Sequence, residues 1–266
     1  MTDQGDERSR LLEHLLPLAQ AAGREILRIY ENPLLAVRRK SDGSPVTEAD
    51  VRAEAIILAG LAKLTPGWRV ISEEAAGKSG SLDSVPADEE TPYWLVDPLD
   101  GTAEFVQRNG EFTVNIALIE HQRPVLGVVL APVAGDLYAG VAGRGAFAED
   151  AGSRRPIACR AVPLQGETVV SSRSHGDAAA LARWLQGRRV AGQAQAGSSL
   201  KFCLLASGQA DTYPRFGPTM EWDTAAGHAV LRAAGGEVTD LAGQPLRYGK
   251  PGLRNPHFVA RGLPPG

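Results

Sequence analysis

The chain has 266 residues, of which 43% are hydrophobic and 22% are charged, and its formal net charge at pH 7 is -3. This composition is ordinary for a globular protein, and the small negative charge excludes a global basic field that would attract nucleic acid or an anionic membrane. An anionic substrate would therefore need cations placed locally. The length is long for one domain and short for two independent ones.

The beginning of the chain does not resemble an export signal. The first ten residues, MTDQGDERSR, lack the basic-then-apolar order of a signal peptide, and the longest mostly apolar run, near 125–134, is too short to span a bilayer. We therefore expect a cytoplasmic protein without a membrane span. The two cysteines, Cys159 and Cys203, fit no metal-binding spacing and are expected to be reduced packing residues.

The first predicted helix covers Leu11 to Tyr30, where apolar residues recur at helical spacing. Pro17 should either kink this helix or mark a later start at Leu16 or Pro17. The basic, polar turn that follows, Arg38 to Pro45, is compatible with a flexible lip over an anionic site and equally with a solvated loop.

A second helix is predicted to open at Thr47 and to end near Leu64. Thr47 is the expected N-cap, and Asp50, three residues later, would complete a capping box. A short strand, Val70 to Ser72, then delivers Glu73 and its neighbour Glu74. Adjacent carboxylates repel each other and need either a cation or water, so both a metal site and an exposed acidic loop explain them. The Gly-, Ser- and acid-rich stretch from 77 to 92 reads as a mobile insertion without chemistry.

The polar residues that follow the apolar run Trp94 to Val96 form the main candidate site. Pro98 forces an extended or turn conformation on Asp97, which we expect at the strand end. Gly101 permits a sharp turn, and Thr102 is the predicted N-cap of a short helix from Ala103 to Gln107.

Two carboxylates, Asp97 and Asp100, converge on this turn with the carbonyl of Leu99 between them. Hard oxygen ligands suit Mg²⁺, and the start of the helix would present free N–H groups to an anion. An ordinary surface turn is the alternative, because Asp, Pro and Gly are common turn residues.

The rest of the chain divides into two kinds of pattern. Strand-like runs at 113–119, 125–130, 137–141 and 145–147 predict an antiparallel sheet. From about Pro156, strands and helices alternate: strands at 168–171 and 210–213, and helices near 177–186, 198–207 and 223–234. The predicted fold class is α/β, with an α+β first half and an α/β second half. Neither the dinucleotide fingerprint nor a P-loop motif occurs.

The segment DPLDGTAEF, with RNGEFTVNIALI after it, closely resembles the signature of the inositol monophosphatase family of Mg²⁺-dependent, lithium-sensitive phosphatases. Within that family it is most similar to the CysQ group of 3'(2'),5'-bisphosphate nucleotidases. The resemblance extends from about Leu11 to Tyr248. It implies a layered αβαβα sandwich in a single unit, residues 1–266, with a catalytic and metal-binding half to about 155 and a substrate-recognition half from 156.

The resemblance also implies roles for individual residues. Two or three Mg²⁺ ions would be held by four carboxylates and one carbonyl: Glu73, Asp97, Leu99 (carbonyl), Asp100 and Asp223. Asp50 and Thr102 would orient the attacking water. Asp223 lies in EWDTAAG, similar to the family's W-D-x-A-A-G, although Asp at a helix start is also a standard cap.

The segments GSSLKFC and YPRFGP resemble parts of the family that contact the nucleotide. They make Ser198, Lys201 and Arg215 candidate substrate ligands. Taken without the resemblance, Lys201 and Arg215 would be interpreted as solvated surface charges. His175 matches the family's histidine near the adenosine only approximately, and a lone histidine often serves local hydrogen bonds. The remaining expected substrate contacts come from the turn and from the metal site: Asp100, Gly101, Thr102 and Asp223.

The implied reaction is hydrolysis of adenosine 3',5'-bisphosphate to AMP and phosphate, a step in sulfur metabolism, by a monomer or homodimer without a nucleic-acid partner. An inositol monophosphatase or a sugar phosphatase resembling fructose-1,6-bisphosphatase is the alternative within the class. A non-catalytic metal- or nucleotide-binding regulator is the alternative of another class. The presence of every acidic ligand and of Thr102 argues against the regulator.

Overall fold

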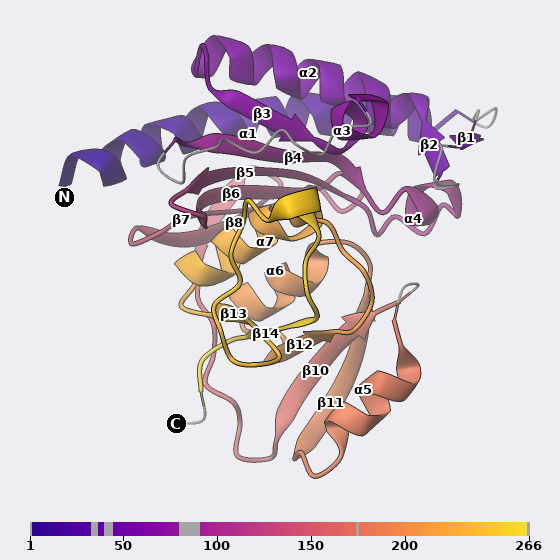
Figure 1. Ribbon diagram of the computed structural model, residues 1–266, viewed down its shortest axis with the longest axis vertical. Coiled ribbons are helices and arrows are strands. Elements are labelled where there is room, and N and C mark those ends of the chain that lie inside the picture. The colour runs from indigo at the N-terminus through magenta and orange to yellow at the C-terminus, as the bar shows by residue number, and fades with distance from the viewer. Residues whose placement is uncertain (1, 33–36, 40–44, 80–90, 174–175, 265–266) are drawn as a thin grey trace.

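The computed structural model describes residues 2–32, 37–39, 45–79, 91–173 and 176–264. Two large β-sheets alternate with three layers of helices (Figure 1). The αβαβα arrangement predicted from the resemblance is confirmed.

Helices α1 (Thr2–Tyr30) and α2 (Glu48–Leu64) form the first layer and cover one face of a seven-stranded sheet (Figure 1). Helix α1 begins earlier than predicted and contains Pro17 in its interior, so the later start is wrong. Helix α2 begins as predicted, with Thr47 as N-cap and Asp50 completing the capping box. Ahead of α2 lie the two short antiparallel strands β1 (Val37–Arg39) and β2 (Pro45–Thr47). Of the predicted basic turn, residues 40–44 lie outside the described residues.

The strands of the first sheet follow one another in chain order. The pair β3–β4 is parallel, and all other neighbours in this sheet are antiparallel. They are β3 (Arg69–Ser72), β4 (Tyr93–Asp100), β5 (Thr113–Glu120), β6 (Arg123–Ala131), β7 (Asp136–Val141), β8 (Gly145–Asp150) and β9 (Ser153–Ile157). Helix α3 (Glu73–Ser79) follows β3, so the first three residues of the predicted insertion are helical; residues 80–90 lie outside the described chain. Helix α4 (Thr102–Val106) follows β4.

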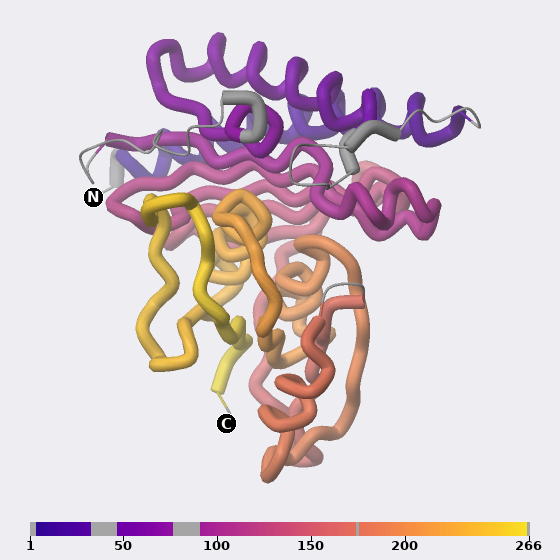
Figure 2. The backbone as a smooth tube through the Cα atoms, turned by 45° about the vertical axis from the view of Figure 1, so that its right-hand side comes forward, coloured from indigo at the N-terminus to yellow at the C-terminus, as the bar shows by residue number. Residues whose placement is uncertain are grey.

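The second sheet is mixed and has the order β11-β10-β12-β14-β13, with β10 parallel to both of its neighbours. Its strands are β10 (Glu167–Ser172), β11 (Val190–Ala196), β12 (Thr212–Arg215), β13 (Glu237–Asp240) and β14 (Phe258–Arg261). The helices of this half are α5 (Ala178–Leu185), α6 (Leu200–Ala206) and α7 (Glu221–Ala233). Helices α6 and α7 lie between the two sheets (Figure 2).

Helix α7 packs closely on the first sheet because two strands present glycines to it. A Cβ on Gly127 of β6 would come within 2.4 Å of the Ala226 carbonyl oxygen, and one on Gly140 of β7 within 2.7 Å of the Ala233 Cβ. Side chains could not fit between sheet and helix at these points. This close packing fixes the beginning of α7, which carries Asp223, against the first half.

Among the described residues, no helix is both long enough and apolar enough to cross a membrane. Cys159 and Cys203 are both buried and free, as expected of packing residues. Burial raises the pKa of the Cys159 thiol to about 11, so it stays protonated.

Candidate active site

The signature turn connects β4 to α4. Strand β4 does not stop at Asp97 as predicted but continues through Pro98 to Asp100, with a shift of register between the two aspartates. Gly101 then adopts φ 93°, and a Cβ there would come within 2.3 Å of the Ser198 hydroxyl oxygen. Only glycine meets both conditions without strain. The turn thereby lies directly against the second half of the molecule.

The predicted N-cap role of Thr102 is wrong. Gly101 is the N-cap of α4 and Thr102 is the first helical residue. The Thr102 hydroxyl lies 3.2 Å from the Asp50 Oδ1, to which it donates, and 3.4 Å from the Leu99 carbonyl oxygen. The threonine therefore contacts the catalytic aspartate that the resemblance implied, instead of capping its own helix.

Asp50 uses its two carboxylate oxygens differently. Its Oδ2 accepts hydrogen bonds from the Thr47 N–H at 2.7 Å and from the Thr47 hydroxyl at 2.6 Å, which is the capping arrangement. Its Oδ1 faces Thr102. Each oxygen has its own partner, so the capping contact of Asp50 does not prevent its contact with Thr102. Burial raises the pKa of Asp50, against the hydrogen bonds from Thr47 that lower it.

Five acidic residues from three separate segments line one cavity of about 300 Å³: the four predicted metal ligands Glu73, Asp97, Asp100 and Asp223, and also Glu104. Glu73 begins α3, immediately after β3, and Leu99 lies on the same wall. Asp223 is the third residue of α7, and its Oδ2 accepts a hydrogen bond from the Met220 N–H at 2.8 Å. Asp223 therefore both caps its helix and lines the cavity.

The electrostatics show that these carboxylates repel one another. Burial, and then the charges of the neighbouring carboxylates, hold the pKa values of Asp97 and Asp223 well above the usual range. Burial also raises the pKa of Asp100 to about 6, against the opposing charge of Lys201. Within the described chain, no three or more His, Cys, Asp or Glu side chains are already arranged to hold a metal ion. The carboxylates thus share one cavity without forming a finished coordination shell.

The second half adds cations to the same cavity, which Lys201 and Arg215 both line. Both are buried, so the interpretation as solvated surface charges is wrong. The Lys201 ammonium donates to the carbonyls of Ala196, at 3.2 Å, and Ser198, and burial lowers its pKa to about 8. Arg215 donates to the Pro218 carbonyl at 3.0 Å. Its Nε is buried and has no hydrogen-bond partner among the described residues.

Ser198 ties this part of the cavity to the signature turn. Its hydroxyl lies 2.7 Å from the carbonyl oxygen of Asp100 and 2.8 Å from that of Glu111, and its backbone has φ 49°. Of the other predicted substrate residues, His175 lies outside the described residues.

The sequence analysis missed an ion pair that holds the Ser198 loop. Arg173 binds the Glu111 carboxylate through two hydrogen bonds of 2.8 and 2.7 Å, and the same carboxylate accepts from the Gly197 N–H at 2.8 Å. Arg173 follows β10 and Glu111 precedes β5, so the pair joins the two halves. Glu111 lies in the segment RNGEFTVNIALI, but Arg173 is 62 residues away in the sequence, and nothing in the spacing shows that they meet.

Residues 7–261 match the model of the inositol monophosphatase family. The 3'(2'),5'-bisphosphate nucleotidase CysQ of Escherichia coli K12 is 49% identical over 243 residues, which is 90% of this chain and 94% of that protein. The Buchnera aphidicola protein of the same name is 41% identical over 90% of this chain and 88% of its own length. The crystal structure of CysQ from Bacteroides thetaiotaomicron superposes with a TM-score of 0.78 at 39% identity, covering 95% of this chain and 97% of that one.

Proposed function

This chain belongs to the inositol monophosphatase family, and from that membership we propose that its acidic cavity removes the 3'-phosphate of adenosine 3',5'-bisphosphate to leave AMP. Its activity is that of a 3'(2'),5'-bisphosphate nucleotidase, a phosphomonoesterase. The particular bisphosphate and the residue roles below are our proposals.

The observation that carries the choice of substrate is the pair of buried cations Lys201 and Arg215 in the same cavity as the carboxylates. A buried guanidinium nitrogen without a partner is costly, and an anionic oxygen is the group that satisfies it best. The carboxylates repel anions, so the cations are the side chains suited to a phosphate that is held without being cleaved. A monophosphate has no second anionic group to place there.

The donor set of the cavity fits Mg²⁺, on which enzymes of this family depend. All the proposed ligands are hard oxygens: Glu73, Asp97, Asp100, Asp223 and the Leu99 carbonyl. The raised pKa values of Asp97 and Asp223 support the same conclusion, because nearby positive charge would offset both the burial and the mutual repulsion that raise them. When bound, two or three such ions would supply Lewis acidity and charge neutralisation at the phosphoryl group.

The chain's own contribution to the attack comes from Thr102 and Asp50. Because the Thr102 hydroxyl donates its proton to the Asp50 Oδ1, the oxygen of that hydroxyl is left as an acceptor for a proton of the attacking water. As the water oxygen bonds to phosphorus, that proton passes to Thr102 and the threonine proton to Asp50. The P–O bond to the ribose breaks with its electron pair on the ribose oxygen, which takes a proton from solvent water to become the 3'-hydroxyl of AMP. The raised pKa of Asp50 favours it as the acceptor of this proton.

The amides of Gly101 and Thr102 complete the proposed phosphate contacts at the start of α4. Ser198 has a positioning role in this proposal. Its hydroxyl contacts the carbonyl oxygens of Asp100 and Glu111, and these contacts hold the signature turn and the loop before Lys201 together. Cytoplasmic location and a monomeric or homodimeric state stay predictions from the sequence.

The test is a phosphate-release panel with Mg²⁺ and with chelator, comparing adenosine 3',5'-bisphosphate, adenosine 3'-monophosphate, inositol 1-phosphate and fructose 1,6-bisphosphate. We expect the highest kcat/KM on adenosine 3',5'-bisphosphate, with AMP as product and no turnover under chelation. Higher kcat/KM on inositol 1-phosphate would reject the proposed substrate. Nucleotide binding without any phosphate release would indicate a non-catalytic regulator.

A further inference from the structure

A second and larger cavity, of about 780 Å³, lies at the other end of the five-stranded sheet. Strand β10 begins at Glu167 in this cavity and ends at Ser172 in the catalytic one, and β12 likewise runs from Thr212 to Arg215. The two cavities are therefore separated by the length of these strands. No step of the proposed reaction uses the second one.

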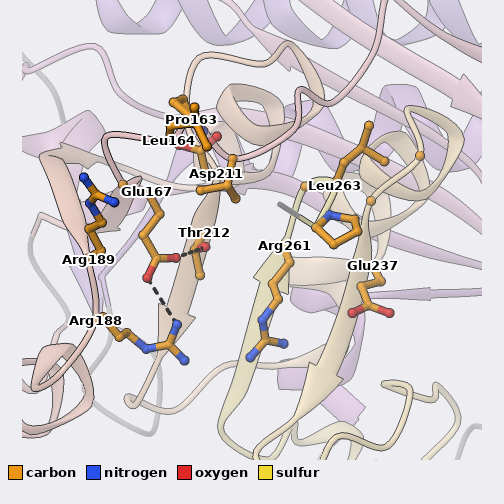
Figure 3. A pocket seen from close by; sticks show the side chains of 16 residues that line it. Pro163, Leu164, Glu167, Arg188, Arg189, Asp211, Thr212, Glu237, Arg261 and Leu263 are labelled. Atoms are coloured by element: carbon orange, nitrogen blue, oxygen red, sulfur yellow. Dashed lines mark hydrogen bonds and ion pairs between the residues drawn. The ribbon is translucent and has the colours of Figure 1, made fainter. Parts of the chain in front are cut away.

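One end of this cavity is cationic. Arg188 and Arg261 come from opposite sides of the cavity, with Glu167 beside Arg188 and Glu237 beside Arg261 (Figure 3). The Glu167 carboxylate accepts hydrogen bonds from Arg188 at 3.1 Å and from the Thr212 hydroxyl at 2.5 Å, so it is already satisfied. Arg261 donates to the neutral hydroxyl of Thr239 at 3.1 Å.

Positive charge is in excess at this end. Asp211 also lines the cavity, but Arg160 neutralises it through two hydrogen bonds of 2.8 and 2.9 Å. Glu237 lies opposite Arg261 on the neighbouring strand, and Glu167 is paired with Arg188. Arg189 is then left as the one positive charge in excess among the charged groups that line the cavity. Burial, and then the charge of Arg188, lowers the pKa of the Arg261 guanidinium, which shows that the two cations repel each other. An anion placed between them would relieve that repulsion.

The other end of the cavity is apolar. Pro163 and Leu164 come from the segment before β10, and Leu263 from the segment after β14 (Figure 3). Leu164 is 83% exposed and Leu263 is 38% exposed, which is unusual for large aliphatic side chains that line the same hollow.

We propose that this cavity binds a small organic anion with an apolar body and one acidic group, the acidic group between Arg188 and Arg261 and the body against Leu164 and Leu263. Ligand sites combine apolar walls with a few polar groups that fix orientation, and this cavity has both. The site is independent of the catalytic cavity, so both can be occupied together.

The probe for this site is 8-anilinonaphthalene-1-sulfonate, an aromatic sulfonate whose fluorescence rises on binding. N-phenyl-1-naphthylamine, the same body without the sulfonate, is the matched neutral probe. We expect saturable binding of the sulfonate that excess AMP does not displace, and much weaker binding of the neutral probe. Arg261→Gln should weaken sulfonate binding about tenfold, the scale of one charge-assisted hydrogen bond. Arg183→Gln, a change at an exposed arginine of α5 outside the cavity, should leave it unchanged.

Phosphate release and the melting temperature are measured for both variants to show that the fold survives. Unchanged sulfonate affinity in Arg261→Gln, equal affinity for the neutral probe, or displacement of the sulfonate by AMP would each overturn the proposal. None of these outcomes bears on the nucleotidase activity, which is measured separately.

Discussion

Replacing Arg215 by alanine tests whether this residue holds the phosphate that is not cleaved. The side chain is 7% exposed, so solvent screens its charge little, and its Nε has no partner among the described residues. A charge-assisted hydrogen bond of this kind contributes roughly 1.5 to 3 kcal/mol, which corresponds to about tenfold to a hundredfold in kcat/KM. Because the contact is the same in the ground and transition states, we expect the loss mainly as a higher KM.

The assay compares two substrates that differ in one group. Adenosine 3',5'-bisphosphate carries the 5'-phosphate and adenosine 3'-monophosphate lacks it, so the variant should lose kcat/KM on the first and little on the second. Arg215→Lys is the matched control, because it keeps the charge and loses the planar Nε donor, and it should fall between wild type and alanine. Lys201→Ala should show the same pattern. Equal proportional losses on both substrates would refute the assignment and make Arg215 a structural residue.

Four further changes test three other residues of the site and one buried histidine outside it. Asp97→Asn should reduce turnover to below about a hundredth while the melting temperature is kept, because a neutral amide cannot balance metal charge; retained turnover would refute its metal role. Asp50→Asn should lower kcat by roughly a hundredfold with Mg²⁺ affinity little changed; lost thermal stability with near-normal kcat would leave it only its capping role. Glu111→Gln should raise KM a few-fold at constant kcat, since it weakens the ion pair that holds the Gly197 amide; a kcat loss at unchanged KM would contradict this. His228, buried against the Tyr248 hydroxyl at 3.0 Å, has its pKa lowered by burial to about 3. As the pH falls, His228 therefore takes up a proton in the unfolded chain before it does so in the folded protein. The free energy of unfolding decreases as pH falls from about 6.5 toward 3, by about 2 kcal/mol at pH 5. Denaturant unfolding of wild type and of His228→Gln at pH 7 and pH 5 should show a smaller decrease in the variant.

The elements that depend on residues close together in the chain could be predicted from the sequence. The capping box of α2 depends on two residues three apart, and the antiparallel strands of the first sheet alternate with clear turns. Strand β11, VAGQAQA, was not predicted because its small and polar residues show no apolar period, and only its last residue, Ala196, is buried. It forms because β10 supplies its hydrogen-bonding partner. Strands β9, β13 and β14 were missed as well.

The residues of the candidate site also differ in whether the sequence alone could identify them. The acidic residues of the turn could be identified because they adjoin Gly101 and Pro98 in the sequence. The burial of Lys201 and Arg215 could not, because it depends on α6 and β12 packing against a turn about a hundred residues away. The N-cap of α4 was misassigned because any Ser or Thr before a helix reads as a cap. Here the left-handed Gly101 takes that position and leaves the Thr102 hydroxyl for Asp50.

Helix α7 has a consequence for how this chain could be divided. Residues 221–222 and 224–231 of the helix are buried, and its two faces complete the cores on either side of it. A fragment ending between β9 and β10 would leave the face of the first sheet that carries Gly127 and Gly140 bare, and the complementary fragment would expose the helix. A cut at this point would therefore leave neither piece with a complete core. An exchange of the substrate-recognition half between relatives would therefore succeed only if α7 and the seven-stranded sheet on which it packs were exchanged together.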